Sequence, residues 1–93
     1  MHIGIWGQRH RRYLKSHRRA LYTSLLASGK LNGYLADIDR QAEEMFPRLV
    51  KQMAESENIN EELKATDTTA WIGKLNNVRN RAAEVVSEEI IYK

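Results

Sequence analysis

The sequence predicts an all-α protein, a helical bundle of about four helices with two long antiparallel helices. Apolar residues recur every three or four positions along most of the chain, and only one proline and five glycines interrupt its 93 residues. No run of alternating apolar and polar residues lies between turn residues, so strands are not expected. A chain of this length forms a single domain, 1–93. Because helices of 26 to 30 residues, about 39–45 Å at ~1.5 Å per residue, overhang such a small domain, we expect homodimerisation to complete the bundle.

The first segment, 4–28, is predicted to form two consecutive helices, 4–16 and 18–28. Serine and histidine around Ser16 are mediocre helix formers, which favours a break there, although one helix through the segment is the alternative. The apolar stripe of this segment is formed by His10, Leu14, His17, Leu21 and Leu25.

A long helix is predicted over 30–56. Either Gly29 ends the preceding helix in the left-handed conformation, or Ser28 caps this one. The single proline, Pro47, lies inside the pattern, and we expect a kink near 43–47 because the apolar register continues past it. That register comprises Leu31, Leu35, Ile38, Ala42, Met45, Leu49 and Met53.

The last long helix is predicted over 60–91. Asn58 or Asn60 is suited to cap it, and two glutamates follow in the first turn, where the helix dipole favours acids. The stretch 66–69, TDTT, is weak for a helix, and Asp67 is equally suited to cap a fresh one. We expect the two long helices to contact a second copy chiefly through Leu35, Ile38, Met45, Trp71 and Leu75.

Charge is distributed unevenly along the chain. Residues 1–30 carry seven Lys or Arg and no acid, whereas residues 31–93 carry eight basic and twelve acidic residues, giving +7 and −4. Basic side chains release counterions when they neutralise phosphates, so a polyanion such as DNA is the expected partner. Ion pairing with acids of the same chain or its dimer mate, or with another acidic protein, is the alternative. The residues expected to contact DNA are Arg9, Arg11, Arg12, Lys15, Arg18 and Arg19.

Other residue types near these positions suit nucleic acid. Aromatic rings at Trp6, Tyr13 and Tyr22 are suited to stack on unpaired bases. The stretch KLNNVRNR, 74–81, contains Asn77, Asn80 and Arg81, which are residue types that read base edges. An ordinary polar helix surface explains that stretch equally well.

The sequence shows no pattern that indicates catalysis, a cofactor or a metal site, and we expect a non-enzymatic protein. His10 and His17 lack a third ligand and are expected to pack beside leucines. Acid pairs such as Asp37 and Asp39 fall among expected surface positions, with no pocket to separate their pKa values. The absence of cysteine and of a membrane-length apolar run leads us to expect a cytoplasmic protein without membrane contact.

Three stretches of the sequence are recognisable as blocks, namely GIWGQRHRRYLKSHRRALYTSLLASGKL (4–31), YLADIDRQAEEMF (34–46) and NNVRNRAAEVV (76–86). Together they resemble the transposon-encoded protein family TnpV. The resemblance implies a small accessory protein of a bacterial mobile element that works close to DNA. It also implies a further segment before the first block in other members, so that this chain corresponds to a trimmed form.

Two functions follow as hypotheses. In the first, an accessory protein binds the DNA backbone through its basic N-terminal helices. In the second, a helical adaptor regulates a recombinase or another protein of the same mobile element without touching DNA. Basic side chains paired with acids across the bundle would favour the adaptor, and a continuous exposed basic stripe would favour DNA.

Overall fold

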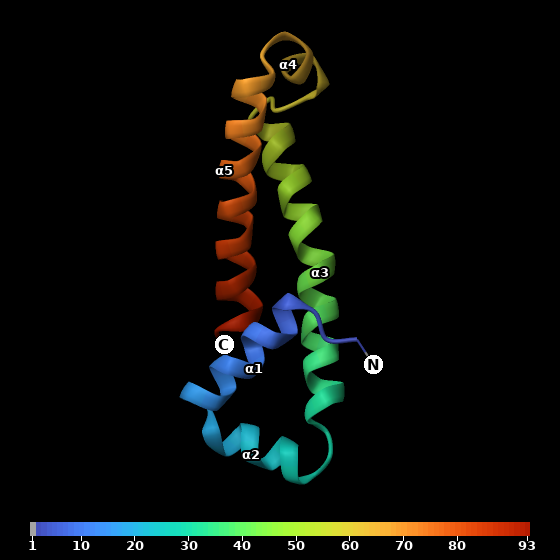
Figure 1. Cartoon of the computed structure of the whole chain (residues 1–93), viewed down its shortest axis with the longest axis vertical. Coiled ribbons are helices and arrows are strands. Elements are labelled where there is room, and N and C mark those ends of the chain that lie inside the picture. Colours follow the sequence, from blue (N-terminus) through green and yellow to red (C-terminus); the bar gives the residue numbers. More distant parts are fainter. Residues whose placement is uncertain (1) are drawn as a thin grey trace.

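The structure, a computed structural model, describes residues 2–93 and contains helices and their connections, with no strand among these residues (Figure 1). The predicted all-α class is therefore confirmed. Five α-helices and a terminal π-helical turn are present where about four helices were expected. In chain order they are α1 (Ile5–His17), α2 (Arg19–Ala27), α3 (Leu31–Ser56), α4 (Glu61–Thr66), α5 (Thr68–Val86) and η1 (Ser87–Ile91).

The molecule is elongated around a long helical hairpin. Helices α3 and α5 lie side by side and antiparallel, α4 closes the far end of the hairpin, and α1 crosses the other end against α3 and η1 (Figure 1). The extents are 56 × 24 × 18 Å and the radius of gyration is 16.8 Å. A compact domain of this size has a radius of gyration of about 12 Å, so the hairpin extends well beyond the part that α1 covers.

The chain breaks between α1 and α2 at Arg18, whose backbone has φ −133° and ψ 54°. Helix α2 then ends at Gly29, which has φ 72°. The backbone N–H of Lys30 donates to the Leu25 carbonyl at 2.9 Å, which closes the turn as in a Schellman motif. The Ser28 hydroxyl also donates to that carbonyl, so Gly29 ends α2 and Ser28 does not cap α3.

Helix α3 continues through Pro47, as expected from the unbroken apolar register. It ends in a second left-handed turn at Asn58, which has φ 59°. The backbone N–H of Ile59 donates to the Ala54 carbonyl at 2.9 Å, and the Ile59 side chain is buried in the turn. An asparagine serves here because its short polar side chain tolerates this conformation better than most residues do.

The single helix expected over 60–91 is wrong, because Asp67 divides it into α4 and α5. Asn60 Oδ1 accepts the N–H of Leu63 at 2.9 Å, and Asp67 Oδ1 accepts the N–H of Ala70 at 3.1 Å. The aspartate side chain competes for a backbone donor and begins a fresh helix, which is the alternative raised for this stretch.

Two apolar clusters form the core where α1 crosses the hairpin. Trp6 packs with residues of α3, α5 and η1 in one cluster, and Leu14 packs with Leu31 and Leu35 in the other. Leu35 is only 1 % exposed within a single chain. It therefore has no surface left for a second copy, and its expected place in a dimer interface is wrong. The homodimer itself stays a prediction.

Candidate nucleic-acid interface

Helix α1 carries most of the basic residues, and a buried carboxylate from α3 holds its N-terminus. The N-cap residue Gly4 has no side chain to accept a hydrogen bond, and the first turn contains no acid. Instead, Asp39 Oδ1 accepts the backbone N–H of Gly7 at 2.9 Å. Asp39 is only 4 % exposed, so its expected surface position is wrong. It lies four residues after Leu35 on the buried face of α3, which is the sequence signal that distinguishes it from Asp37.

Two glycines allow this close approach of α1 to α3. A Cβ atom on Gly7 would lie 3.0 Å from the carbonyl oxygen of Leu35 and 3.1 Å from the Asp39 Cβ. A Cβ atom on Gly4 would lie 3.1 Å from Asp39 Oδ1. A larger residue at position 7 would therefore press on the backbone of α3, and one at position 4 would displace the Asp39 carboxylate.

His10 connects α1 to both neighbouring elements. Its side chain is 1 % exposed, with Nδ1 2.6 Å from the Ile91 carbonyl oxygen and Nε2 3.2 Å from the Tyr34 hydroxyl. In the neutral ring, Nδ1–H donates to the carbonyl and Nε2 accepts from Tyr34. Both nitrogens are thus engaged within the fold. His17 is exposed and stacks on Tyr13, with ring centroids 5.1 Å apart, so only His10 packs in the interior as expected.

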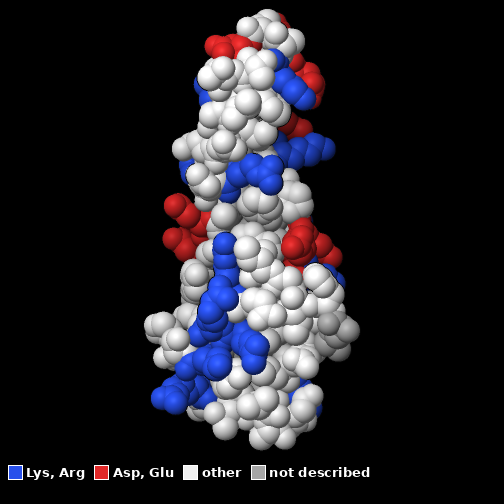
Figure 2. All heavy atoms as spheres, in the orientation of Figure 1, with Lys and Arg blue, Asp and Glu red and all other residues white. Residues whose placement is uncertain are grey.

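The basic side chains expected from the sequence lie along α1, at the break after it and at the start of α2, and this set is hereafter called the basic face. It consists of Arg9, Arg11, Arg12, Lys15, Arg18 and Arg19. All are exposed except Arg9, which is half-buried. Figure 2 shows the Lys and Arg side chains as a continuous band over the end of the molecule where α1 lies. One helix and the start of the next therefore present these charges together.

The ion pairs among residues 2–93 all lie outside the basic face. Arg40 bonds Asp37 at 2.7 Å and Glu44 at 3.3 Å within α3, and Arg81 of α5 bonds Glu57 at 2.7 Å. The Arg40 guanidinium lowers the pKa of Asp37, through its hydrogen bond first and its charge second, and Asp37 in turn raises the pKa of Arg40. In each of these exposed ion pairs, both the acidic and the basic residue belong to the long hairpin.

Three members of the basic face contact aromatic rings or the main chain instead. The guanidinium carbon of Arg9 lies 5.0 Å from the Trp6 ring centroid, and Lys15 Nζ lies 5.6 Å from that of Tyr22. Arg18 donates from a guanidinium nitrogen to a main-chain oxygen of Lys93 at 3.0 Å. The two ring contacts orient Arg9 and Lys15 without supplying a negative charge.

The second stretch considered from the sequence is engaged elsewhere. Arg81 donates to Asn77 Oδ1 at 2.9 Å and to both carboxylate oxygens of Glu57 at 2.7 Å. These contacts tie α5 to the end of α3. The interpretation of Arg81 as a reader of base edges is therefore not supported, and its contacts are those of a surface residue that stabilises the hairpin.

The exposed aromatic ring beside the basic face belongs to a residue that the sequence analysis missed. Trp6 is only 6 % exposed, which removes it from the rings proposed to stack on bases. Tyr92 is 53 % exposed, and its ring contacts Tyr13 with centroids 5.5 Å apart and planes at 57°. No local pattern marks Tyr92, because it approaches α1 only through the return of the chain along α5.

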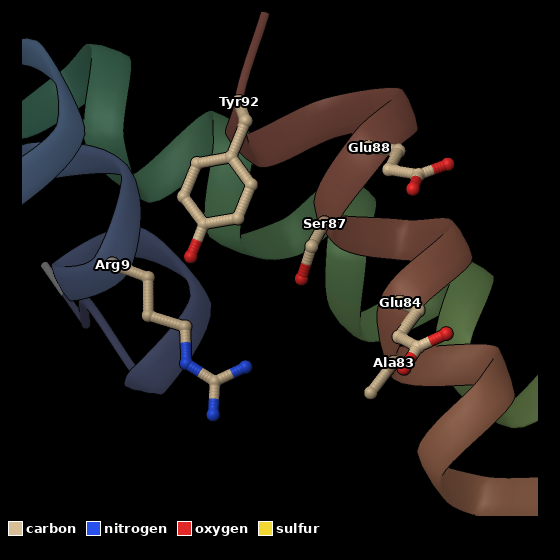
Figure 3. A pocket seen from close by; sticks show the side chains of 6 residues that line it. All are labelled: Arg9, Ala83, Glu84, Ser87, Glu88 and Tyr92. Atoms are coloured by element: carbon tan, nitrogen blue, oxygen red, sulfur yellow. The ribbon is translucent and has the colours of Figure 1, made fainter. Parts of the chain in front are cut away.

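A groove of about 360 Å³ lies between α1 and the C-terminal turn (Figure 3). Arg9 extends from α1 on one side, while the other lining residues come from the end of α5 and from the turn after it. The Tyr92 hydroxyl points toward the Arg9 side. The lining residues are Arg9, Ala83, Glu84, Ser87, Glu88 and Tyr92.

Fold and charge together define an elongated, all-helical protein that presents an arginine-rich face at one end. The model of the family described as transposon-encoded protein TnpV matches residues 1–91, and the chain belongs to that family. The resemblance seen in the sequence is thereby confirmed. No curated protein and no solved structure matches the chain. Within residues 2–93, each helix is too short or too polar to cross a membrane.

Proposed function

We propose that this transposon-encoded protein is a non-enzymatic accessory protein that binds the DNA backbone through its basic face. One observation carries the proposal. The acids of residues 31–93 outnumber the basic residues there by four, yet none of those described forms an ion pair with the basic face. The charge of the basic face is therefore directed to a partner outside the chain.

The residue types of the basic face suit phosphate. Five of its six members are arginines, whose planar guanidinium groups donate paired hydrogen bonds to phosphate oxygens. Each neutralised phosphate releases counterions, which supplies affinity that does not depend on base sequence. Because the acids lie elsewhere in the chain, the molecule also has a charge asymmetry that steers this face toward a polyanion (Figure 2).

The rigidity of α1 supports the same function. Asp39 holds the start of the helix and His10 fixes its middle to Tyr34 and Ile91, all through buried or part-buried hydrogen bonds. A helix fixed in this way presents its charges without first being ordered, so little conformational entropy is lost when DNA binds.

The proposal is tested by a salt titration with labelled duplex DNA, followed by fluorescence anisotropy. Each phosphate contact contributes about −0.9 to the slope of log K against log salt on duplex DNA. Replacing Arg12, Lys15 and Arg19 together by Gln should therefore flatten the line by roughly two to three units.

A matched control removes the same charge from the hairpin. Arg48, Lys51 and Lys74 are exposed residues outside the basic face. Replacing them by Gln takes the net charge from +3 to 0, as the first triple variant does. The control should keep most of the slope. If both variants flatten the salt line equally, DNA binding depends only on the net charge of the protein and not on the basic face.

A protein with no DNA affinity at about 50 mM salt would contradict the proposal, because backbone binding is strongest at low ionic strength. In that case the adaptor role is favoured. The basic face would then meet an acidic surface of another protein from the same transposon.

A further inference from the structure

The groove between α1 and the C-terminal turn opens beside the basic face and shares Arg9 with it. Its volume of about 360 Å³ lies at the lower end of the range of small-ligand sites, roughly 300–1,000 Å³. A single nucleotide unit, with one base and one phosphate, is a ligand of suitable size. The backbone of a strand that follows the basic face would pass the mouth of this groove.

Tyr92 supplies an aromatic surface at this position. More than half of its side chain is exposed, and the Tyr13 ring supports it from within the molecule. In Figure 3 the ring lies at one end of the space between Arg9 and the end of α5, with its hydroxyl directed toward Arg9. An exposed ring held in place by a second ring offers a preformed surface for stacking, and base stacking on aromatic residues does not depend on base identity.

The charges in the groove orient such a ligand. The Arg9 guanidinium is held over Trp6 and bonds no carboxylate among residues 2–93, although two glutamates line the opposite wall. A phosphate is attracted to Arg9. On the opposite wall the Ser87 hydroxyl points into the groove, whereas the Glu84 and Glu88 side chains extend away from Arg9 (Figure 3). The hydroxyl is therefore the group of that wall that suits the polar atoms of a neutral base. The phosphate therefore belongs on the α1 side and the base on the side of η1.

We propose that the groove binds an unpaired nucleotide of single-stranded DNA, with its base stacked on Tyr92 and its phosphate on Arg9. This inference rests on the proposed function and specifies that the DNA bound in the groove is single-stranded or unpaired. A base inside a duplex is stacked on both faces and cannot reach the ring without leaving the helix. The groove therefore distinguishes single strands, or duplexes with unpaired bases, from intact duplex.

The test compares variants of Tyr92 on single-stranded and duplex DNA of about twelve nucleotides or base pairs, a length within the range of single-strand binding sites. Tyr92→Leu keeps an apolar side chain against Tyr13 and removes the ring, whereas Tyr92→Phe keeps the ring. Tyr92→Leu should weaken single-strand binding by about fivefold or more. Tyr92→Phe should stay within about twofold of the unaltered protein. Duplex affinity and both salt slopes should be unchanged, because the phosphate contacts remain.

A second measurement uses only the unaltered protein, so it does not depend on how a variant folds. An abasic strand keeps the phosphates and loses the bases, and it should bind about fivefold or more weakly than the ordinary strand. Equal binding of abasic and ordinary strands, or equal single-strand affinity of Tyr92→Leu and the unaltered protein, would overturn the inference. In both cases salt-dependent duplex binding would still stand. A lack of binding to either DNA would instead contradict the proposed function itself.

Discussion

Replacing Asp39 by Ala should show that this buried carboxylate, rather than local sequence, fixes the position of α1. Asp39 Oδ1 accepts the N–H of Gly7 at 2.9 Å, and the side chain is 4 % exposed. Helix α1 has no capping side chain of its own and no acid in its first turn. Its free N–H groups and positive dipole end therefore depend on a residue 32 positions away.

The expected loss of stability follows from these contacts. Loss of an N-cap side chain costs about 0.5–2 kcal/mol, and a hydrogen bond to a charged group contributes about 1.5–3 kcal/mol. The two describe largely the same interaction, so Asp39→Ala should lower the free energy of unfolding by about 1.5–3 kcal/mol. For a domain of this size that corresponds to a fall in Tm of roughly 6–24 °C. Asp39→Asn keeps an oxygen acceptor and loses the charge, so its effect should be smaller.

The measurement is urea denaturation followed by circular dichroism, with Asp37→Ala as the control. Asp37 lies two residues earlier on α3, and its 58 % exposed side chain bonds Arg40. Exposed ion pairs contribute about 0–1 kcal/mol, so the control should remain near the unaltered protein. Equal losses in the two variants would refute the reasoning, because burial and capping would then have no effect at Asp39.

Three further predictions concern packing, the proline and assembly. Gly7→Ala places a Cβ atom 2.6 Å from the Ile3 Cγ2 atom and 3.0 Å from the Leu35 carbonyl oxygen. It should therefore lower the free energy of unfolding, measured by thermal denaturation, by more than about 2 kcal/mol. Gly73→Ala, on α5 with no atom within 4 Å of the new Cβ, should instead stabilise by about 0.5–1 kcal/mol, and a loss there would contradict the argument. Pro47→Ala should be neutral or stabilising, because it restores a backbone hydrogen bond within α3, and a loss above about 1 kcal/mol would show that the proline shapes the helix. The proposed homodimer should give about twice the chain mass of 10.8 kDa in light scattering, and a monomeric mass at tens of micromolar would exclude it.

The sequence by itself determined the helical class and most of the helix ends. Apolar residues three and four apart predict a buried stripe on each helix, because side chains at those spacings share one face. The ends depend on contacts within a few residues, such as the left-handed Gly29 and the side-chain caps of Asn60 and Asp67. At Asp67 the sequence left two outcomes open, since a local cap and a continuous helix differ little in free energy.

The charge separation was equally visible in the sequence, because counting residues requires no geometry. That most of the basic face is exposed, and that it forms no ion pair with these acids among residues 2–93, was not. Acids of the same chain were available to neutralise it, and only the structure shows Asp37, Glu44 and Glu57 bonded to arginines of the hairpin instead.

Tertiary structure alone decided the contacts that shape the candidate site. Asp39 meets Gly7 across 32 positions, His10 meets Ile91 across 81, and Tyr92 reaches the Arg9 side of the groove from the other end of the chain. The apolar pattern of a helix predicts which face is buried. It does not predict which other helix covers that face, or at which position along the helix axis the two meet. Those choices depend on how all the apolar faces of the chain fit together at once, and this is a property of the packed molecule rather than of any local stretch.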